Sequence, residues 1–398
     1  MKVLFIHTKY MERGGEDSVV ESEIKLLKEN GYDVEVLYFN NGNHTFFNLL
    51  FLPFNIISYF KIIKVLKRVK PDVVHMHNLH FAASNSVIWA VSHMNVPMVR
   101  TLHNYRMFCP SGTLFHNNEV YMNSFNHSFP WSAVKDKVYR DSYLLSFWLS
   151  LIIWLHKRLG TYKKITRYIA LNEKSRSIFL SSDLKLKKSQ IVTKPNFIRS
   201  STAPSALVRG NHFLYIGRLS PEKGINVLLR AFATNGLPLT IIGDGPMRNE
   251  VIKQQEQNPN INWIGFQNKE AIDAELQKCA ALIMPSICLE GMPLTILEAF
   301  AAGTPVITSK LGAMETMVTH NVNGLLFAPN NADSLNRQLH KWQIFTEVKK
   351  HDFSLHALHT YEHKYTPKKN LSALLSIYYS TMNQKHRPAL ISHHPQLS

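Results

Sequence analysis

Two short segments of the chain combine residue types that suit binding of a phosphorylated ligand. The first, 217–224 (GRLSPEKG), places Arg218 and Lys223 five residues apart in a turn that directly follows an apolar run. Two cations at the carboxyl end of a strand can bind an anion, and a diphosphate in particular. An ordinary surface loop is the alternative that this segment alone leaves open.

The second segment, 290–298 (EGMPLTILE), holds Glu290 in a loop and Glu298 inside the helix expected after it. Gly291 and Pro293 allow a sharp turn, and free N–H groups at a helix start can bind phosphate oxygens. The helix dipole adds to that attraction. One carboxylate can then bond sugar hydroxyls and the other a ribose. Two unrelated surface acids are the alternative, which the presence of 217–224 disfavours.

Weaker signals accompany these segments. The turn 243–246 (GDGP) lacks the third glycine of a dinucleotide fingerprint, and Gly14–Gly15 allows backbone amides to approach an oxyanion. His103 ends an apolar run and should face a ligand cleft, although a lone histidine is more often structural. Metal ligation by His75, His77 and His80 is possible in principle, but the first two are interpreted as strand-end residues. No P-loop, HExxH, paired-Cys, GxSxG or DxD motif is present, so no metal is expected.

Apolar runs of strand length alternate with helical patterns along the chain, as in parallel sheets covered by helices. Gly31 suits the end of the first helix. The expected strands are 3–6, 34–39, 71–77, 97–103, 212–217, 239–243, 281–285 and 305–307, and the expected helices are 17–29, 225–234, 270–280, 295–302 and 367–382.

The alternation is interrupted near 195–210, where Ser, Pro and Ala indicate a linker. The sequence therefore predicts an α/β protein with two facing Rossmann-like domains, 1–195 and 196–366. A C-terminal helix, 367–385, is expected to cross back to the first domain, and a tail, 386–398, follows it. Ligands bind at the carboxyl ends of strands in such sheets, which places the ligand in the cleft between the domains.

Length and composition exclude several classes of protein. The 398 residues are 45% hydrophobic and 11% aromatic, which excludes wholesale disorder, collagen and coiled coil. Three scattered cysteines are too few for a disulfide framework and indicate a reducing compartment. The first apolar run, Val3 to Ile6, is too short for a signal peptide.

The formal net charge is +17, and residues 1–195 carry +12 of it. Such an excess indicates an acidic partner: a nucleic acid, an anionic membrane or a phosphorylated substrate. Two apolar segments, 46–60 and 143–158, interrupt the first domain, and neither is long enough to span a bilayer. The cations that follow the first segment, with no acid among them, are Lys61, Lys64, Lys67, Arg68 and Lys70.

Two interpretations of these apolar segments stay open. In one, they lie in the plane of a membrane while the five cations meet acidic headgroups. In the other, they are buried helices with a solvated basic face. Membrane contact is favoured for 46–70 because apolar and basic stretches adjoin, and the two interpretations are balanced for 143–158.

The segments 217–224, 241–246 (IIGDGP), 284–307 (MPSICLEGMPLTILEAFAAGTPVI) and 323–327 (NGLLF) together resemble the retaining glycosyltransferases of family GT4. Residues 14–37 and 103–112 (HNYRMFCPSG) resemble, more loosely, the glycine loop and the His-containing loop of bacterial polysaccharide-synthesis members. The resemblance implies the GT-B fold, in which the first domain binds the acceptor and the second the nucleotide sugar.

The resemblance also implies roles for matched residues. Arg218 and Lys223 would hold the donor diphosphate, Glu290 would contact the donor sugar, and His103 would lie near the anomeric carbon. The other implied donor-binding residues are Gly15, Gly217, Gly243, Gly245, Gly291, Met292, Pro293, Leu294, Thr295 and Glu298, the last for the ribose. The chain departs from the family at 287–289 (ICL), where a short polar stretch is usual, and at Asn172, where Ser is frequent.

The favoured function is metal-independent, retaining transfer of a sugar from a nucleotide-diphosphate sugar to a lipid-linked oligosaccharide or polysaccharide acceptor, in O-antigen or capsule synthesis. The nucleotide sugar is a co-substrate and no cofactor is expected. The expected location is cytoplasmic, peripheral at the inner face of the cell membrane. One alternative is a nucleotide-sugar 2-epimerase with the same two-domain arrangement. Another is a basic membrane- or nucleic-acid-binding protein; a nucleic-acid partner is not expected because no such motif is present.

Overall fold

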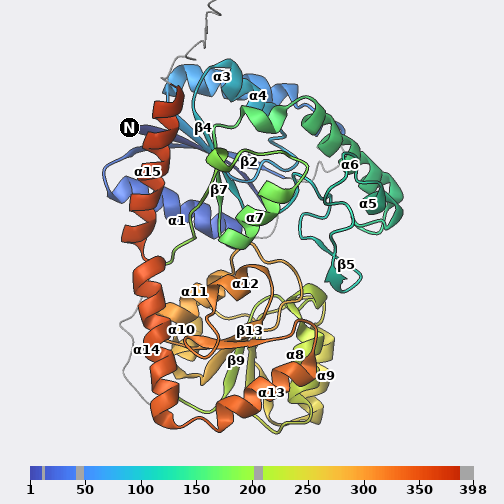
Figure 1. Cartoon of the computed structure of the whole chain (residues 1–398), viewed down its shortest axis with the longest axis vertical. Coiled ribbons are helices and arrows are strands. Elements are labelled where there is room, and N and C mark those ends of the chain that lie inside the picture. Colours follow the sequence, from blue (N-terminus) through green and yellow to red (C-terminus); the bar gives the residue numbers. More distant parts are fainter. Residues whose placement is uncertain (11–13, 42–48, 201–208, 386–398) are drawn as a thin grey trace, which may run out of the picture.

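The computed structural model describes residues 1–10, 14–41, 49–200 and 209–385. Two six-stranded sheets lie one above the other, each covered by helices (Figure 1). The first sheet has the order β2-β1-β3-β4-β7-β8, and all its strands are parallel. Its strands are β1 Lys2–Lys9, β2 Asp33–Asn40, β3 Val73–Met76, β4 Met98–Leu102, β7 Arg167–Ala170 and β8 Ile191–Thr193.

The second sheet has the order β11-β10-β9-β12-β13-β14 and is parallel as well. Its strands are β9 Phe213–Ile216, β10 Leu239–Ile242, β11 Ile261–Trp263, β12 Ala281–Met284, β13 Val306–Ser309 and β14 Gly324–Phe327. A small antiparallel hairpin, β5 Phe115–His116 and β6 Glu119–Val120, projects from the first domain. The predicted fold class, with two parallel α/β sheets, is confirmed.

Helices connect the strands in both domains. Those of the first are α1 Gly15–Glu29, α3 Ile56–Val69, α4 Ser86–His93, α5 Trp131–Lys135, α6 Tyr143–Arg158 and α7 Glu173–Ser181, with 3-10 turns η1 Thr161–Lys164 and η2 Lys188–Gln190. The second sheet is followed or covered by η3 Pro221–Lys223, α8 Ile225–Phe232, α9 Arg248–Gln257, α10 Lys269–Lys278, α11 Leu294–Ala301, α12 Gly312–Met317, α13 Ala332–Gln343, α14 Glu347–Lys364 and α15 Pro367–Lys385.

The continuous apolar run of β1 follows from its central position in the sheet. Val3 and Phe5 pack on one face against α1 and α15, whereas Leu4 and Ile6 pack on the other face against α3 and α4. Alternate side chains of a strand point to opposite faces, so a strand covered on both sides must be apolar throughout. This packing explains why the sequence identifies β1 so clearly.

The last helix, α15, returns to the first domain as predicted. Figure 1 shows α14 along the second domain and α15 continuing along the first. Leu374, Ile377 and Tyr378 of α15 lie in the same core cluster as Val3 and Phe5. The first domain is therefore completed by a segment at the far end of the chain.

Several elements differ from the expectations. The run 71–77 forms a strand only over Val73–Met76, and 97–103 only over Met98–Leu102, so His77 and His103 lie just beyond their strands. Strands β7, β8, β11 and β14, of three or four residues each, were not predicted as strands. Residues 46–48 of the first apolar segment, 201–208 of the linker and the tail 386–398 lie outside the described residues.

Candidate active site

A cleft of about 1360 Å³ lies between the two domains. It opens where the carboxyl ends of both sets of strands face each other, as expected for doubly wound sheets. Thirteen predicted residues line it: Gly15, His103, Gly217, Arg218, Lys223, Gly243, Gly245, Glu290, Gly291, Met292, Pro293, Leu294 and Thr295. Residues far apart in the sequence are thus brought to one cavity.

Lys223 and Glu290 form the main ion pair of this cleft. The Lys223 Nζ atom lies 2.6 Å from Glu290 Oε1, which also accepts from Ser286 Oγ at 2.8 Å. Burial alone would lower the pKa of Lys223, but the Glu290 carboxylate outweighs that effect and raises it. Lys223 is therefore held as a cation. The second carboxylate oxygen, Glu290 Oε2, has no hydrogen-bond partner among the described residues, so it is available to a ligand hydroxyl.

Two helices begin at the cleft from opposite sides. Helix α1 starts at Gly15 and helix α11 at Leu294. A Cβ atom placed on Gly15 would lie 3.7 Å from Leu294 Cδ1, so the two starts approach each other closely. The first N–H groups of a helix have no partner within the helix, and the dipole there is positive. The cleft therefore presents backbone donors suited to phosphate from both domains.

The loop after β12 also contacts the first domain directly. A Cβ atom on Gly291 would lie 2.6 Å from the backbone oxygen of His103, closer than any side chain can approach. The side-chain amide of Asn172 donates to the backbone oxygen of Gly291 at 2.6 Å, while its oxygen caps α7 by accepting from Ser175 N. Asn172, noted as a departure from the family, therefore bridges the domains.

Glycine is also required at the floor of the cleft. Gly243 follows β10 with φ +133°, and a Cβ atom there would lie 1.9 Å from the backbone oxygen of Gly217. Two strand ends, β9 and β10, are thereby held in direct backbone contact, which Gly217 N completes by donating to Ile242 O at 3.0 Å. Segment 287–289, which has apolar residues where the family usually has a short polar stretch, is buried. Its burial accounts for its apolar residues.

Glu298 is the predicted site residue that does not line the cleft. It lies in α11, and its Oε1 atom is 3.1 Å from Lys269 Nζ. The ribose role that the family resemblance implies for Glu298 stays a prediction.

The first domain contributes residues that sequence reasoning did not assign. Tyr10 and Glu16 line the cleft, and the Tyr10 hydroxyl donates to Glu16 Oε2 at 2.7 Å. Burial is the main cause that raises the pKa of the Glu16 carboxyl. The one sequence signal for Glu16 was its position directly after Gly14–Gly15.

A smaller cavity of about 70 Å³ adjoins the cleft in the first domain. His77, Arg100, His103 and Arg106 line it, together with the apolar side chains of Leu149, Ile152 and Ile153 on α6. Arg100 Nη1 and Arg106 Nε are buried without a hydrogen-bond partner among the described residues. This cavity therefore combines two cations that have unsatisfied N–H groups with the carboxylate of Glu16 and the apolar side chains of α6.

Buried histidines should make stability depend on pH. Burial is the main cause that lowers the pKa of His103 to about 3 and that of His156 to about 4. An unfolded histidine titrates near pH ~6.5, so below that pH the unfolded state binds more protons than the native state. Stability is thus fully present above pH ~6.5 and falls as the pH drops toward the native values. We expect urea unfolding to give a free energy about 1.4 kcal/mol lower per buried histidine at pH 5.5 than at pH 7.5.

His156→Gln provides the control for this prediction. His156 is buried, bonds Thr161 Oγ1 at 3.0 Å and does not line the cleft. Glutamine keeps a hydrogen-bonding side chain but does not titrate. The difference in unfolding free energy between the two pH values should shrink by about 1.4 kcal/mol; an unchanged difference would contradict the assigned cause.

These features define a class of protein. Two facing Rossmann-like domains, a cleft at the carboxyl ends of their strands and a returning C-terminal helix are the GT-B fold. The structure matches the crystal structure of Anabaena Alr3699/HepE in complex with UDP with a TM-score of 0.68 and 16% sequence identity, covering 95% of this chain and 100% of that one. At this identity the similarity shows the fold alone.

Sequence comparison identifies the family. Residues 13–201 match the family described as Glycosyltransferase Family 4, and residues 202–350 match Glycosyl transferases group 1. Together the two matches run from residue 13 to residue 350 and include every residue that lines the cleft except Tyr10. The chain therefore belongs to the GT-B glycosyltransferases of the family 4 type, which confirms the predicted family.

Curated relatives match over part of their length. An uncharacterized glycosyltransferase of Methanocaldococcus jannaschii is 33% identical over 129 residues, 31% of this chain and 33% of the relative. The O-antigen chain mannosyltransferase C of Escherichia coli is 25% identical over 183 residues, 45% of this chain and 49% of the relative. The matched regions thus span about a third to a half of these relatives.

Proposed function

We propose that this protein transfers a sugar, with retention of anomeric configuration and without a metal ion, from a nucleotide-diphosphate sugar to a lipid-linked oligosaccharide or polysaccharide acceptor. The observation that carries the proposal is the cleft itself. Arg218, the Lys223–Glu290 pair and the start of α11 lie opposite His103 and the start of α1. Family membership and the O-antigen mannosyltransferase among the relatives support the same reaction class.

Charge development explains how these residues would act. Breaking the anomeric C–O bond leaves negative charge on the diphosphate and positive charge on the sugar. Arg218, Lys223 and the first N–H groups of α11 are donors at the place where the negative charge would grow, and donors already in position there lower the barrier. The chain's own cations therefore take the role that a metal ion has in other diphosphate sites.

The proposed reaction needs no protein nucleophile. The acceptor hydroxyl attacks the anomeric carbon from the face that the diphosphate leaves, and a phosphate oxygen takes the hydroxyl proton. Glu290 is held on Oε1 by Lys223 and Ser286, so Oε2 is left to bond a sugar hydroxyl and orient the ring. Glu290 therefore positions the sugar rather than attacking it.

A panel of UDP- and GDP-sugars tests this proposal. Each would be incubated with purified protein, with and without a membrane extract containing acceptors, and with and without EDTA. Transfer should depend on the extract, persist in EDTA and give a product whose anomeric configuration, read by NMR, equals that of the donor. An inverted product would exclude retention. Conversion of the donor without an acceptor would favour the 2-epimerase instead.

The small cavity of the first domain is the proposed acceptor side. It touches His103, where the donor sugar would lie, and its free guanidinium N–H groups on Arg100 and Arg106 suit an anionic group such as the phosphate of a lipid-linked acceptor. Its apolar wall belongs to α6, whose first turn carries exposed apolar side chains. A lipid tail could therefore leave the cavity along an apolar surface.

We also propose that the apolar surface formed by segment 49–54, α3, α5 and the first turn of α6 binds an anionic membrane. Among the described helices, none is long and apolar enough to cross a bilayer. The segment 49–54 lies beside α6, since Trp148 Nε1 donates to Leu49 O at 2.8 Å. Exposed apolar side chains gather on this segment, on α3 and around α5 and α6: Leu50, Phe51, Phe54, Ile56, Ile57, Phe60, Trp131, Tyr143, Leu144 and Phe147.

The cations predicted to meet headgroups continue this surface. Lys61, Lys64, Lys67, Arg68 and Lys70 are all exposed, on or just after α3. Apolar side chains beside exposed cations are the pattern of helices that lie in the membrane interface. Helix α6 is divided between the two environments that were considered for it. Leu149, Ile152 and Ile153 are buried, whereas its first turn is exposed and is available to the proposed membrane contact.

Charge reversal on α3 tests membrane binding. We expect Lys61→Glu, Lys64→Glu and Lys67→Glu together to weaken binding to vesicles with anionic lipid about 100-fold or more, since each cation near such a surface contributes about 1 kcal/mol. Co-sedimentation with vesicles of increasing phosphatidylglycerol content measures it.

A matched variant separates position from net charge. Lys185, Lys187 and Lys188 are exposed in the same domain but lie around η2, away from the apolar surface. Reversing these three gives the same net charge and should leave vesicle binding close to wild type. Equal loss in both triple variants would show that only overall charge matters.

A further inference from the structure

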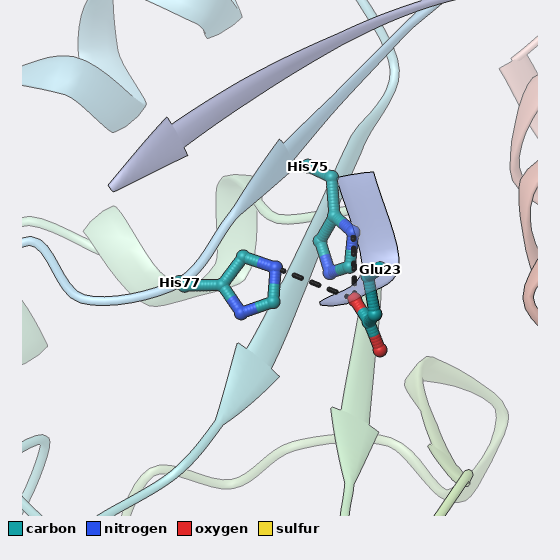
Figure 2. Close-up of side chains that lie close together, drawn as sticks. All are labelled: Glu23, His75 and His77. Atoms are coloured by element: carbon teal, nitrogen blue, oxygen red, sulfur yellow. Dashed lines mark ion pairs between the residues drawn. The ribbon is translucent and has the colours of Figure 1, made fainter. Parts of the chain in front are cut away.

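A chain of buried polar side chains leads from the core of the first domain to the cleft. Glu23 of α1 and His77, just after β3, are both fully shielded from solvent. His77 Nδ1 lies 2.9 Å from Nε2 of His103, which lines the cleft. Figure 2 shows the Glu23 carboxylate facing the rings of His75 and His77.

Glu23 is held in place by a cation from the segment that leaves the domain. Lys194 Nζ lies 2.6 Å from Glu23 Oε1, and neither side chain is exposed. Glu23, His75 and His77 are spaced closely enough for a metal site, but the donor set does not suit one. The Lys194 ammonium already neutralises the carboxylate, and both nitrogens of His75 are used, by Tyr378 OH at 2.7 Å and Thr101 Oγ1 at 2.8 Å.

Two atoms in this row of buried side chains lack a hydrogen-bond partner. Glu23 Oε2 and His77 Nε2 are buried without a hydrogen-bond partner among the described residues, and they face each other at 3.6 Å. A buried polar atom without a partner is costly, so the small movement that closes this contact is favourable. Closure requires a proton on His77 Nε2, because a ring lone pair facing a carboxylate would be repelled.

That proton determines the state of the next ring. A neutral His77 with its proton on Nε2 has a lone pair on Nδ1, which can only accept a hydrogen bond. The partner must then be the Nε2–H group of His103. Burial lowers the pKa of both rings, which keeps them neutral near pH 7. His103 is left with a lone pair on Nδ1, which has no partner among the described residues.

We propose that Glu23, acting through His77, selects the His103 tautomer that presents the Nδ1 lone pair to the cleft. Glu23 and His77 are positioning residues in this scheme, since neither lines the donor cleft. Nδ1 would then accept a hydrogen bond from a sugar hydroxyl and so orient the donor. This role rests on the proposed sugar transfer. The other tautomer would present an N–H group at the same place and could not accept that bond.

Removing the buried ion pair as a unit tests the proposal. Glu23→Met with Lys194→Met replaces both charges by apolar side chains of similar length, a change that buried ion pairs often tolerate. Long-range ¹H–¹⁵N spectra of histidine-labelled protein show which ring nitrogen carries the proton, and His103→Gln identifies the His103 signal. We expect protonated Nε2 and free Nδ1 in the wild type, and a mixture of tautomers in the double variant.

Two outcomes would overturn the proposal. One is a wild-type His103 with its proton on Nδ1. The other is a double variant, folded by thermal unfolding, whose His103 keeps the wild-type tautomer. The control pair Lys157→Met with Asp183→Asn removes a 2.8 Å ion pair of the same domain that does not contact these histidines, and it should leave the spectrum of His103 unchanged.

A kinetic measurement gives the positioning role its own test. The double variant should lose about tenfold in kcat, as second-layer partners of active-site histidines typically do. Its donor KM should stay within about twofold, because Arg218, Lys223 and the start of α11, which are proposed to bind the donor diphosphate, lie in the second domain and are unchanged. If the His103 tautomer changes in the double variant but kcat does not, Glu23 and His77 have no positioning role in sugar transfer. If the wild type transfers no sugar, the proposed function fails, whereas the spectra still decide the tautomer.

Discussion

Replacing Arg218 or Lys223 by alanine is expected to lower the rate of sugar transfer about 10²–10³-fold while the protein stays folded. Both line the cleft beside the start of α11, where the departing diphosphate would develop its charge. Loss of one preorganised donor at such a place typically costs that much in kcat. Steady-state rates at saturating donor, with circular dichroism for folding, measure the effect.

The control for these two variants is an exposed cation of the same domain. Lys253 lies in α9, is exposed and does not line the cleft. Lys253→Ala removes the same charge and should keep wild-type transfer. Near-wild-type rates in both Arg218→Ala and Lys223→Ala would show that the diphosphate is not stabilised at this end of the cleft.

Lys223→Ala has a second consequence that separates it from Arg218→Ala. It removes the cation at 2.6 Å from Glu290, leaving Ser286 as the described partner of that carboxylate. Lys223→Ala combined with Glu290→Gln removes the unpaired charge. If repulsion between Glu290 and the diphosphate adds to the loss, the double variant should bind UDP more tightly than Lys223→Ala alone, which calorimetry measures.

Much of the donor side could be predicted because it depends on local sequence. Arg218, Lys223 and Glu290 each follow a short apolar strand within a few residues, and parallel strands end at one edge of a sheet. Their convergence therefore follows from the alternation of strands and helices alone. The structure brings them together as this reasoning expects.

The first domain was less predictable because its key contacts join distant segments. His77 meets His103 and Glu23, and Glu23 meets Lys194, which lies 171 residues along the chain. Nothing in the sequence near Glu23 distinguishes it from a surface acid of an amphipathic helix. Register between strands and helices decides such pairings, and only the folded structure supplies it.

Segment 143–158 shows a related ambiguity. Its apolar composition fits a buried helix and a membrane contact equally well, since both environments select the same residues. The structure divides it: Leu149, Ile152 and Ile153 are buried, whereas Tyr143 and Leu144 are exposed. A helix that is buried along one part and exposed along another cannot be assigned to either environment from composition.

Gly291→Ala is expected to lower transfer about 10²-fold while leaving stability nearly unchanged. A Cβ atom at this position would lie 2.6 Å from the backbone oxygen of His103 in the other domain. The domains or the His103 loop must therefore shift by part of an ångström or more, and a displacement of about 1 Å in an active site can cost about 10²-fold. Initial rates and the melting temperature measure the two effects.

Gly31→Ala is the opposite case and serves as the control. Gly31 has φ +79° just after α1, and a Cβ atom there meets nothing within 4 Å. The left-handed backbone makes alanine unfavourable by about 1 kcal/mol, but no contact with the cleft changes. We expect Gly31→Ala to lose stability and keep its rate, and Gly291→Ala to lose its rate and keep its stability. If Gly291→Ala instead transfers normally, the close approach of Gly291 to His103 is not part of the active arrangement.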